Sequence, residues 1–467
     1  MGEAYRGAVP LFNSSIRIEA RPERLSSDAG ALLLREVAER TGILRWLDAN
    51  LEDKRDPELI THPQSELLAT TMLLMAQGWR DQDDADALRD DPLFRLSVSS
   101  RRGVAPLLAP PPPADGDLRG TPDGLASQPT LSRLYRRAMA RAEYDLVGLD
   151  IDSLPVEVEG RQEGSAYNAH YHARIYHPIV ASLGELGDIV DVRLREGTVH
   201  TAEGALDVVL PLVDRLEREV CELAFVRMDA GFPADPLLSG LEDRASSIPY
   251  VARVRNNSRL DKMAGPILAI PEVAALTPGD EIFVEFRYRA DSWSRDRRVV
   301  LVVVRREGEL LPRHFWLITS WSPEQMSGMK LLDLYRKRGS AEALMGEWMN
   351  VIQPALSSAR RPKSHYQGVK PETRTPSGDP FAINEAILLV SAMAYNLAHA
   401  LRVVVSEVSG EGWSVQRLRD RVLKTAARVV VHARRATVVV AAAAGKLWSA
   451  IWARLAALHP IQRISTA

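Results

Sequence analysis

Tyr335, Arg338 and Glu342 follow one another at helical spacing in the segment LYRKRGSAEALMGEWM. A helix turns by about 100° per residue, so the three side chains fall within a wedge of about 60° on one face. A phenol, a guanidinium and a carboxylate together can contact a phosphate and hold a cation. Two simpler interpretations stay open. The Arg338–Glu342 pair can merely support an amphipathic helix, and the Gly-Ser dipeptide after Arg338 can end one helix and cap the next.

Two aspartates on predicted strands are candidates to join Glu342. Apolar residues alternate with Asp150 and Asp152 in YDLVGLDID, and the strand predicted in CELAFVRMDAGF ends at Asp229. Clustered carboxylates repel one another unless a cation neutralises them, and hard divalent cations prefer carboxylate oxygens. Because two Mg²⁺ ions can support phosphoryl transfer, we predict a two-metal site at Asp152, Asp229 and Glu342. Mn²⁺ is expected to be able to replace Mg²⁺.

The surrounding elements must bring these acids together. Strands are predicted at residues 144–152, 173–184 and 188–197, followed by a helix, a strand, a helix and a strand. This order matches the ribonuclease-H-like plan, in which the active site lies at strand ends. Residues 256–330 are rich in strand-forming residues and predict an inserted β region, after which the chain reaches the helix of Glu342.

A chain of 467 residues is long enough for two or three domains. The expected fold class is α/β, a ribonuclease-H-like mixed sheet flanked by helices, with an inserted β region and a helical N-terminal domain. The predicted regions, in chain order, are a helical N-terminal DNA-binding or assembly region (1–104), a Pro/Gly-rich linker (105–128), the first part of the catalytic core (129–255), the inserted β region (256–330), the second part of the core (331–405) and a basic C-terminal region (406–467).

The overall composition is that of an ordinary globular protein, with 46% hydrophobic and 26% charged residues and a formal charge of −2. The single cysteine, Cys221, excludes an internal disulfide and a cysteine-based zinc site. No apolar run approaches the length of a membrane span, and the N-terminus lacks a signal-peptide pattern. We therefore expect a soluble, cytoplasmic protein without a membrane partner.

Basic residues gather in two places, although the net charge is close to neutral. The segment PTLSRLYRRAMARA (129–142) predicts a basic helix. From Trp413 onward Asp420 is the only acidic residue, whereas the basic residues are Arg417, Arg419, Arg421, Lys424, Arg428, Arg434, Arg435, Lys446, Arg454 and Arg463. This asymmetry predicts a surface that faces phosphates, with a merely solvated helix face as the alternative.

Taken together, the motifs resemble the DDE transposases of bacterial insertion sequences, in the superfamily with a Y-x2-R-x3-E-x6-K signature. The similarity is greatest to the IS-thirteen-eighty branch of the IS-four-like group, and it spans nearly the whole chain. The stretches that carry it, in the expected order, are LSSDAGALLLREV, LASQPTLSR, LDIDS, QEGSAYNAHYH, VRMDAGF, YRKRGSAE and AMAYNLAHALR.

The resemblance implies metal-binding acids on the first strand, after the fourth strand and in the signature. Matched residue by residue, these are Asp152, Asp229 and Glu342. Asp150 is the alternative for the first acid, but in the family a small hydroxyl residue usually follows that acid, as Ser153 follows Asp152 here. Tyr335 and Arg338 are implied to contact DNA phosphates.

The sequence departs from the signature at its last position, where Met349 replaces the lysine and removes one cationic phosphate contact. Lys363 is a candidate to replace that lysine. In relatives a tryptophan of the β insertion stacks on a base flipped out of the DNA. Here Trp293, in ADSWSRDRRVV, takes that position, with a plain packing role as the alternative, and Arg297 and Arg298 are expected to contact the DNA backbone.

The expected function is that of a transposase that cuts both ends of its element and joins them to target DNA. Its implied partners are double-stranded DNA, namely the terminal inverted repeats and the target, and a second copy of the chain that holds the other end. Two alternatives stay open: a two-metal DNA endonuclease without strand transfer, and an inactive DNA-binding derivative.

Overall fold

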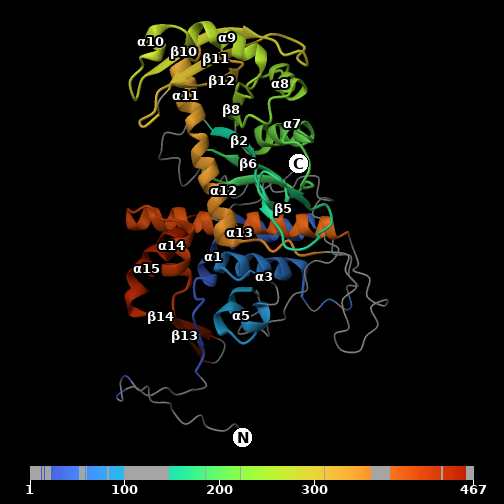
Figure 1. The fold of residues 1–467 in the computed structure, drawn as a ribbon. Coiled ribbons are helices and arrows are strands. Elements are labelled where there is room, and N and C mark those ends of the chain that lie inside the picture. The colour runs from blue at the N-terminus through green and yellow to red at the C-terminus, as the bar shows by residue number, and fades with distance from the viewer. Residues whose placement is uncertain are drawn as a thin grey trace.

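A computed structural model describes most of residues 23–98, then residues 147–358, 379–432 and 435–458 apart from single positions. The predicted linker (105–128) and basic helix (129–142) lie outside the described residues, as do Lys363 and Arg434. Figure 1 shows two parts one above the other, a sheet with its helices and a mainly helical part, with the long helix α13 crossing at their boundary.

One mixed sheet of eight strands forms the upper part, in the spatial order β10-β11-β12-β9-β8-β2-β6-β7. Its strands are β2 (Val147–Ser153), β6 (Ile179–Leu183), β7 (Ile189–Arg193), β8 (Leu223–Met228), β9 (Tyr250–Val254), β10 (Glu281–Tyr288), β11 (Arg297–Val304) and β12 (Arg313–Thr319). β2 pairs antiparallel with β6 and parallel with β8, which pairs parallel with β9. The first five sheet strands along the chain thus have the order 3-2-1-4-5, which is the ribonuclease-H-like arrangement, and the predicted fold class is confirmed.

The predicted strand at residues 173–184 is wrong in one respect, because it forms two strands in two sheets. Its first half is β5 (Ala173–Tyr176), which pairs with β3 (Val156–Glu157) and β4 (Ala166–Asn168) in a small separate sheet. Its second half is β6, in the large sheet. Pro178 lies between the two strands, where a residue without an N–H cannot continue a ladder.

The inserted region extends the main sheet rather than forming a sheet of its own. It begins with α9 (Ser258–Leu268) and α10 (Pro271–Ala274), which the sequence did not lead us to expect. β12 then pairs antiparallel with β9, and β11 and β10 follow outward. All eight residues of β11 are buried, because one face packs against the core under α9 and the other against α11.

The two faces of the sheet are covered by helices. α7 (Ala205–Arg215) and α8 (Asp235–Glu242) pack on one face, and α11 (Gly328–Arg336) packs on the other. The side chain of Ser327 caps α11 by accepting a hydrogen bond from the Lys330 N–H. α12 (Arg338–Ile352) continues from α11 along the sheet and reaches α13 (Figure 1).

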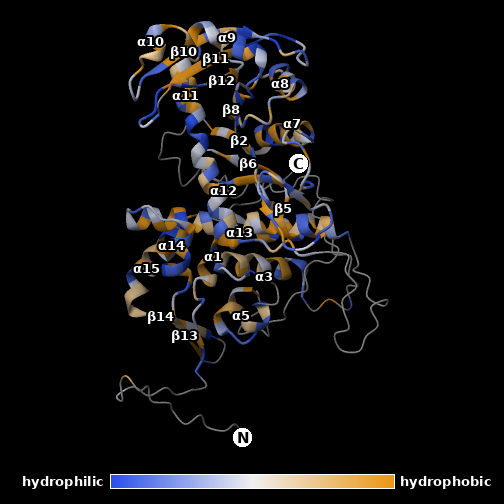
Figure 2. Ribbon diagram, viewed as in Figure 1, coloured by the Kyte–Doolittle hydropathy of each residue, from blue (hydrophilic) through white to orange (hydrophobic). Residues whose placement is uncertain are grey.

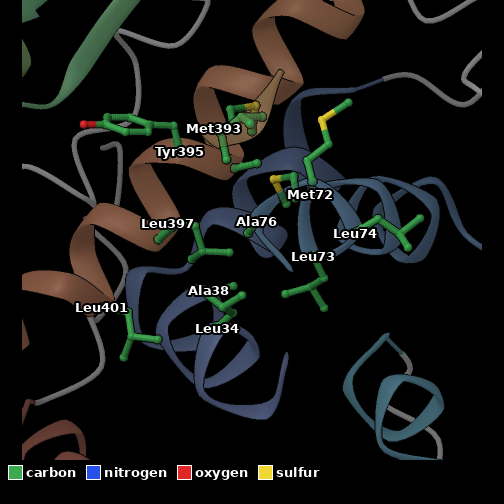
Figure 3. Close-up of a cluster of buried hydrophobic side chains, with 14 of the residues drawn as sticks. Leu34, Ala38, Met72, Leu73, Leu74, Ala76, Met393, Tyr395, Leu397 and Leu401 are labelled. Atoms are coloured by element: carbon green, nitrogen blue, oxygen red, sulfur yellow. The ribbon is translucent and has the colours of Figure 1, made fainter. Parts of the chain in front are cut away.

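The lower part is built around α13 (Pro380–Ser409), which packs against helices from both ends of the chain. The helices of this part are α1 (Ala31–Thr41), α2 (Ile43–Asn50), α3 (Gln64–Gln77), α4 (Asp84–Ala87), α5 (Pro92–Val98), α14 (Val415–Leu418) and α15 (Ala442–Ala457). Of these, α1, α3, α14 and α15 contact α13 directly. A sheet of β1 (Leu25–Ser26), β13 (Ala427–His432) and β14 (Arg435–Val440) closes this part. Figure 3 shows Leu34 and Ala38 of α1, Ala76 of α3 and Leu397 of α13 in the core of this part.

One apolar core therefore joins α1, α3 and α5 to α12, α13 and α15, across the predicted region boundaries. α13 is long and apolar enough to cross a membrane by length and composition, with a mean hydropathy of 1.6 in its most apolar window. The expectation drawn from the sequence missed this property. Because 78% of that window is buried inside the protein, α13 has the burial of a core helix.

Candidate active site

Asp152 and Asp229 lie at the same edge of the sheet, because the strands that carry them are parallel neighbours. Asp152 is the sixth residue of β2, and Asp229 directly follows β8. The last paired residues of the two strands are Ile151 and Met228, so the next residue of each strand is an acid. The Oδ1 atom of Asp152 accepts a hydrogen bond of 2.8 Å from the Ser153 N–H, which fixes its carboxyl group.

Glu342 reaches this edge from α12, and the helix break foreseen near Gly339 occurs slightly earlier. α11 ends at Arg336 and α12 begins at Arg338, with Lys337 between them at φ −62° and ψ −12°. Because Lys337 keeps right-handed helical angles, the two helices run nearly end to end and the predicted face survives. The Arg338 guanidinium lies 6.0 Å from the centre of the Tyr335 ring. Figure 2 shows hydrophilic residues around this junction, beside the apolar strands.

Arg338 contacts all three acids. Its Nη1 donates to Asp152 Oδ2 at 2.9 Å, and its Nη2 lies 3.4 Å from Asp229 Oδ1 and also donates to Glu342 Oε1. The side chains of Asp152 and Arg338 are 12% and 15% exposed, whereas those of Asp229 and Glu342 are 39% and 53% exposed. The structure thus brings together the three acids that the sequence singles out, around one guanidinium.

The electrostatics of the site follow from its burial. Loss of solvation raises the pKa of Asp152 to about 6, with Arg338 and the Ser153 N–H opposing the shift and Asp229 and Glu342 adding to it. Burial disfavours the Arg338 cation, but Asp152, Tyr335 and the other two acids more than compensate and raise its pKa. Burial also raises the pKa of Tyr335 to about 12, so its hydroxyl keeps its proton and can donate it in a hydrogen bond at neutral pH.

The chemistry of the donors fits a divalent cation, but the arrangement is closed around Arg338. Three carboxylates provide only hard oxygen ligands, and one guanidinium leaves two of their negative charges uncompensated. Within the described ranges no group of three His, Cys, Asp or Glu side chains is already arranged to hold a metal ion. The cation that these carboxylates share in the structure is Arg338, so they would have to turn from it toward a metal.

Asp150, the alternative first acid, is committed elsewhere. Its carboxylate accepts two hydrogen bonds from Arg227, of 2.5 Å from Nε and 2.7 Å from Nη2, and both side chains are almost fully buried. Arg227 Nη1 also donates to the Leu334 carbonyl at 2.7 Å, near the end of α11. The pair therefore joins β2 and β8 to α11. Reasoning from the sequence missed this role, although an arginine within the apolar strand AFVRM was a visible signal.

Trp293, Arg297 and Arg298 do not face a DNA-binding surface in this structure. Trp293 is 6% exposed and packs edge-on against Tyr288, with ring centres 5.4 Å apart. Arg297 and Arg298 are buried, and their guanidinium groups are bound by carboxylates of the protein. Arg297 contacts Asp235 and Glu242, and Arg298 contacts Glu285. The expected DNA contacts are therefore not supported, because each side chain is held in the interior by its partners.

The basic C-terminal region is also partly engaged within the protein. Arg417, Lys424 and Arg454 form ion pairs with Glu411, Asp28 and Glu407. Arg419 donates to the Val351 carbonyl at 2.7 Å. Within the described part of the chain, no such ion pair is formed by Arg421, Arg428, Arg435 and Lys446. Fewer basic residues are therefore available to face phosphates than the sequence suggests.

Met349, which replaces the signature lysine, packs against the lower core from α12. It offers no cation to a phosphate. Cations that reasoning from the sequence overlooked lie instead in a cavity beside Tyr335 and Arg338, where Arg253 and Arg306 belong to the end of β9 and to the connection after β11. Neither belongs to a recognisable motif, because the fold alone brings them next to α11 and α12.

Comparisons with known proteins give a family match and a similar solved structure. Residues 8–460 match the family model described as transposase DDE domain, group 1. No curated protein matches the chain significantly. Among solved structures, the synaptic complex of piggyBac transposase with hairpin DNA is similar at 14% sequence identity over 94% of this chain and 87% of that chain, with a TM-score of 0.38. The family match includes every element that holds Asp152, Asp229 and Glu342.

Proposed function

The chain belongs to the family of transposase DDE domains, and on that premise we propose that it cuts both ends of a mobile DNA element and joins them to target DNA. The observation that carries the proposal is the meeting of Asp152, Asp229 and Glu342, from three distant segments, at one edge of the sheet. We also propose that two Mg²⁺ ions, replaceable by Mn²⁺, bind there and that two copies of the chain act together on DNA.

The three acids would hold the cations through their carboxylate oxygens. When bound, such ions supply activation of the attacking oxygen and stabilisation of the leaving oxygen in phosphoryl transfer. Arg338 presents a planar fork of donors that can bind two oxygens of one phosphate. Tyr335 retains its proton because of its raised pKa, so its hydroxyl can donate a hydrogen bond to a phosphate oxygen.

The proposal is tested by changing the acids while keeping their shape. In Asp152→Asn, Asp229→Asn and Glu342→Gln a neutral amide replaces a carboxylate, so metal-dependent cleavage and joining should both be lost. Binding to a DNA end should survive, because it draws on basic residues outside this site. The measurements are a gel shift and a cleavage assay with Mg²⁺ or Mn²⁺ on each variant, and a Glu342→Gln protein that cuts at the wild-type rate refutes the catalytic role.

A pre-cut end offered together with a plasmid separates transposition from the nuclease alternative. A transposase joins the 3′-hydroxyl of that end to the plasmid, whereas an endonuclease leaves it unjoined. Lack of metal-dependent cleavage by the wild-type protein would instead favour an inactive DNA-binding derivative.

A further inference from the structure

A cavity of about 310 Å³ opens beside the junction of α11 and α12. The ends of β9, β11 and β12 form its other wall, and its charged lining includes Arg253, Arg306, Arg313, Arg336, Arg338 and Glu342. Arginines thus outnumber carboxylates on its walls. Because Arg338 and Glu342 line it, the cavity is continuous with the candidate active site.

The arginines of this cavity differ in their partners. Arg313 pairs with Glu309 at 2.8 Å, and Arg336 pairs with Glu281 at 2.5 Å. Arg253 and Arg306 have no carboxylate partner within the described ranges. The Arg253 guanidinium lies over the Phe315 ring at 5.1 Å, which holds it in place and leaves its donors available.

The residues without a carboxylate partner lie on the cavity side of the sheet. Arg253 is paired with Leu317 across β9 and β12, and Leu317 and Phe315 pack on the face that α11 covers. Two unpaired guanidinium groups that line one cavity repel one another unless an anion lies between them. The cavity is at the lower end of the size range of ligand sites, which is enough for one phosphate and part of its sugar.

We propose that this cavity is a second phosphate subsite, in which Arg253 and Arg306 bind a DNA backbone phosphate next to the one that reacts at the carboxylates. The inference rests on the proposed function, because a chain of phosphates is what can extend from the carboxylate site into an adjoining basic cavity. Its role is to position the DNA, so Arg253 and Arg306 take no part in the chemistry.

The test combines Arg253→Ala/Arg306→Ala with DNA ends that carry a neutral methylphosphonate at one position at a time. Binding is measured by fluorescence anisotropy at several salt concentrations. The wild-type protein should bind about tenfold more weakly to the DNA end whose methylphosphonate occupies one position near the cut. The double variant should bind unmodified DNA about tenfold more weakly, and the slope of log affinity against log salt concentration should fall by about one in magnitude. Methylphosphonate at that one position should not weaken its binding further, whereas at other positions it should act as in the wild type.

Arg259→Ala/Arg295→Ala is the matched control. It removes the same charge from two arginines that are 53% and 47% exposed and lie outside the cavity. This control should stay as sensitive as the wild type to methylphosphonate at that position. Thermal melting of both double variants checks that they fold, and exposed Arg253 and Arg306 should be replaceable without loss of melting temperature.

A double variant that keeps wild-type sensitivity at every position overturns the subsite. If that variant is insensitive but the wild-type protein neither cuts nor joins DNA, the proposed function fails instead. Calorimetry with inorganic phosphate distinguishes a site for DNA backbone phosphate from a site for free phosphate. For a DNA backbone site, no saturation by inorganic phosphate is expected below millimolar concentration. Micromolar phosphate binding that the double variant loses would mean a free-phosphate site and would also overturn the proposal.

Discussion

Asp150 and Asp152 are two positions apart on one strand, and their neighbours give them different tasks. Arg227 neutralises Asp150 with two hydrogen bonds in the interior. Asp152 shares Arg338 with two other acids and has its pKa raised to about 6 by burial. The types and spacing of the residues were enough to predict the three acids. They could not reveal the Asp150–Arg227 pair, because it depends on the register of β2 against β8.

The raised pKa of Asp152 gives the site a pH dependence whose sign can be worked out. The folded chain holds this proton more tightly than the unfolded chain, in which an aspartate has its ordinary pKa of 3.8. The resulting stability is therefore complete below about pH 4 and is lost as pH rises through about 6. A divalent cation must displace the same proton. Mn²⁺ affinity should therefore rise by up to about tenfold per unit between about pH 5 and 6 and level off above about pH 7.

Isothermal titration calorimetry with Mn²⁺ over this pH range measures the effect. Asp152→Asn is the control. It should bind Mn²⁺ more weakly, and its Mn²⁺ affinity should not rise with pH up to about 6. An affinity that does not change between about pH 5 and 7 in the wild-type protein would contradict the role of Asp152 as a ligand.

Among the elements, the sheet and α11 position the site through one buried contact. Arg227 of β8 holds Asp150 of β2 and the Leu334 carbonyl of α11. Hydropathy and turn signals predicted the succession of strands and helices along the chain, since each strand is short and bounded by polar residues. They did not predict that β10–β12 continue the same sheet, because antiparallel pairing of β12 with β9 joins residues far apart along the chain.

Gly184 tests how closely this contact is packed. A Cβ atom added at Gly184 would lie 2.5 Å from Asp150 Oδ2 and 2.8 Å from Arg227 Nη2. Gly184→Ala should lower the free energy of unfolding by about 1–3 kcal/mol and reduce activity, because the ion pair must shift. Gly346→Ala, in α12 where an added Cβ meets open space, is the control and should raise stability by about 0.5–1 kcal/mol. Chemical denaturation measures both, and equal stability of the two variants would count against this packing.

On the scale of the whole molecule, the site lies where α11, which packs on the sheet, is followed by α12, which packs in the lower core. Ala341, near Glu342, belongs to the same lower core as the N-terminal helices. The region boundaries predicted from the sequence follow changes in composition. They could not show that α1, α3 and α13 share one core, because a Leu-rich helix face does not identify its partner.

This shared core predicts that a defect in the N-terminal helices reaches α13. Leu73→Ala in α3, where the side chain is 1% exposed, should lower the free energy of unfolding by about 2–5 kcal/mol. Amide hydrogen exchange should then quicken in both α3 and α13. Leu206→Ala, at an α7 position that is 38% exposed, should change neither the free energy of unfolding nor the amide exchange of α3 and α13. Faster exchange confined to α3 would indicate separate units.

The identity of the carboxylates as metal ligands can be tested by changing the ligand and the metal together. Mn²⁺ accepts a thiolate more readily than Mg²⁺ does, because Mg²⁺ is a harder ion. The measurement is the joining of a pre-cut DNA end to a plasmid by Asp152→Cys with each ion in turn. We predict no joining with Mg²⁺ and partial recovery with Mn²⁺, while the wild-type protein works with both. Joining by Asp152→Cys at the wild-type rate with Mg²⁺ would contradict metal binding by Asp152.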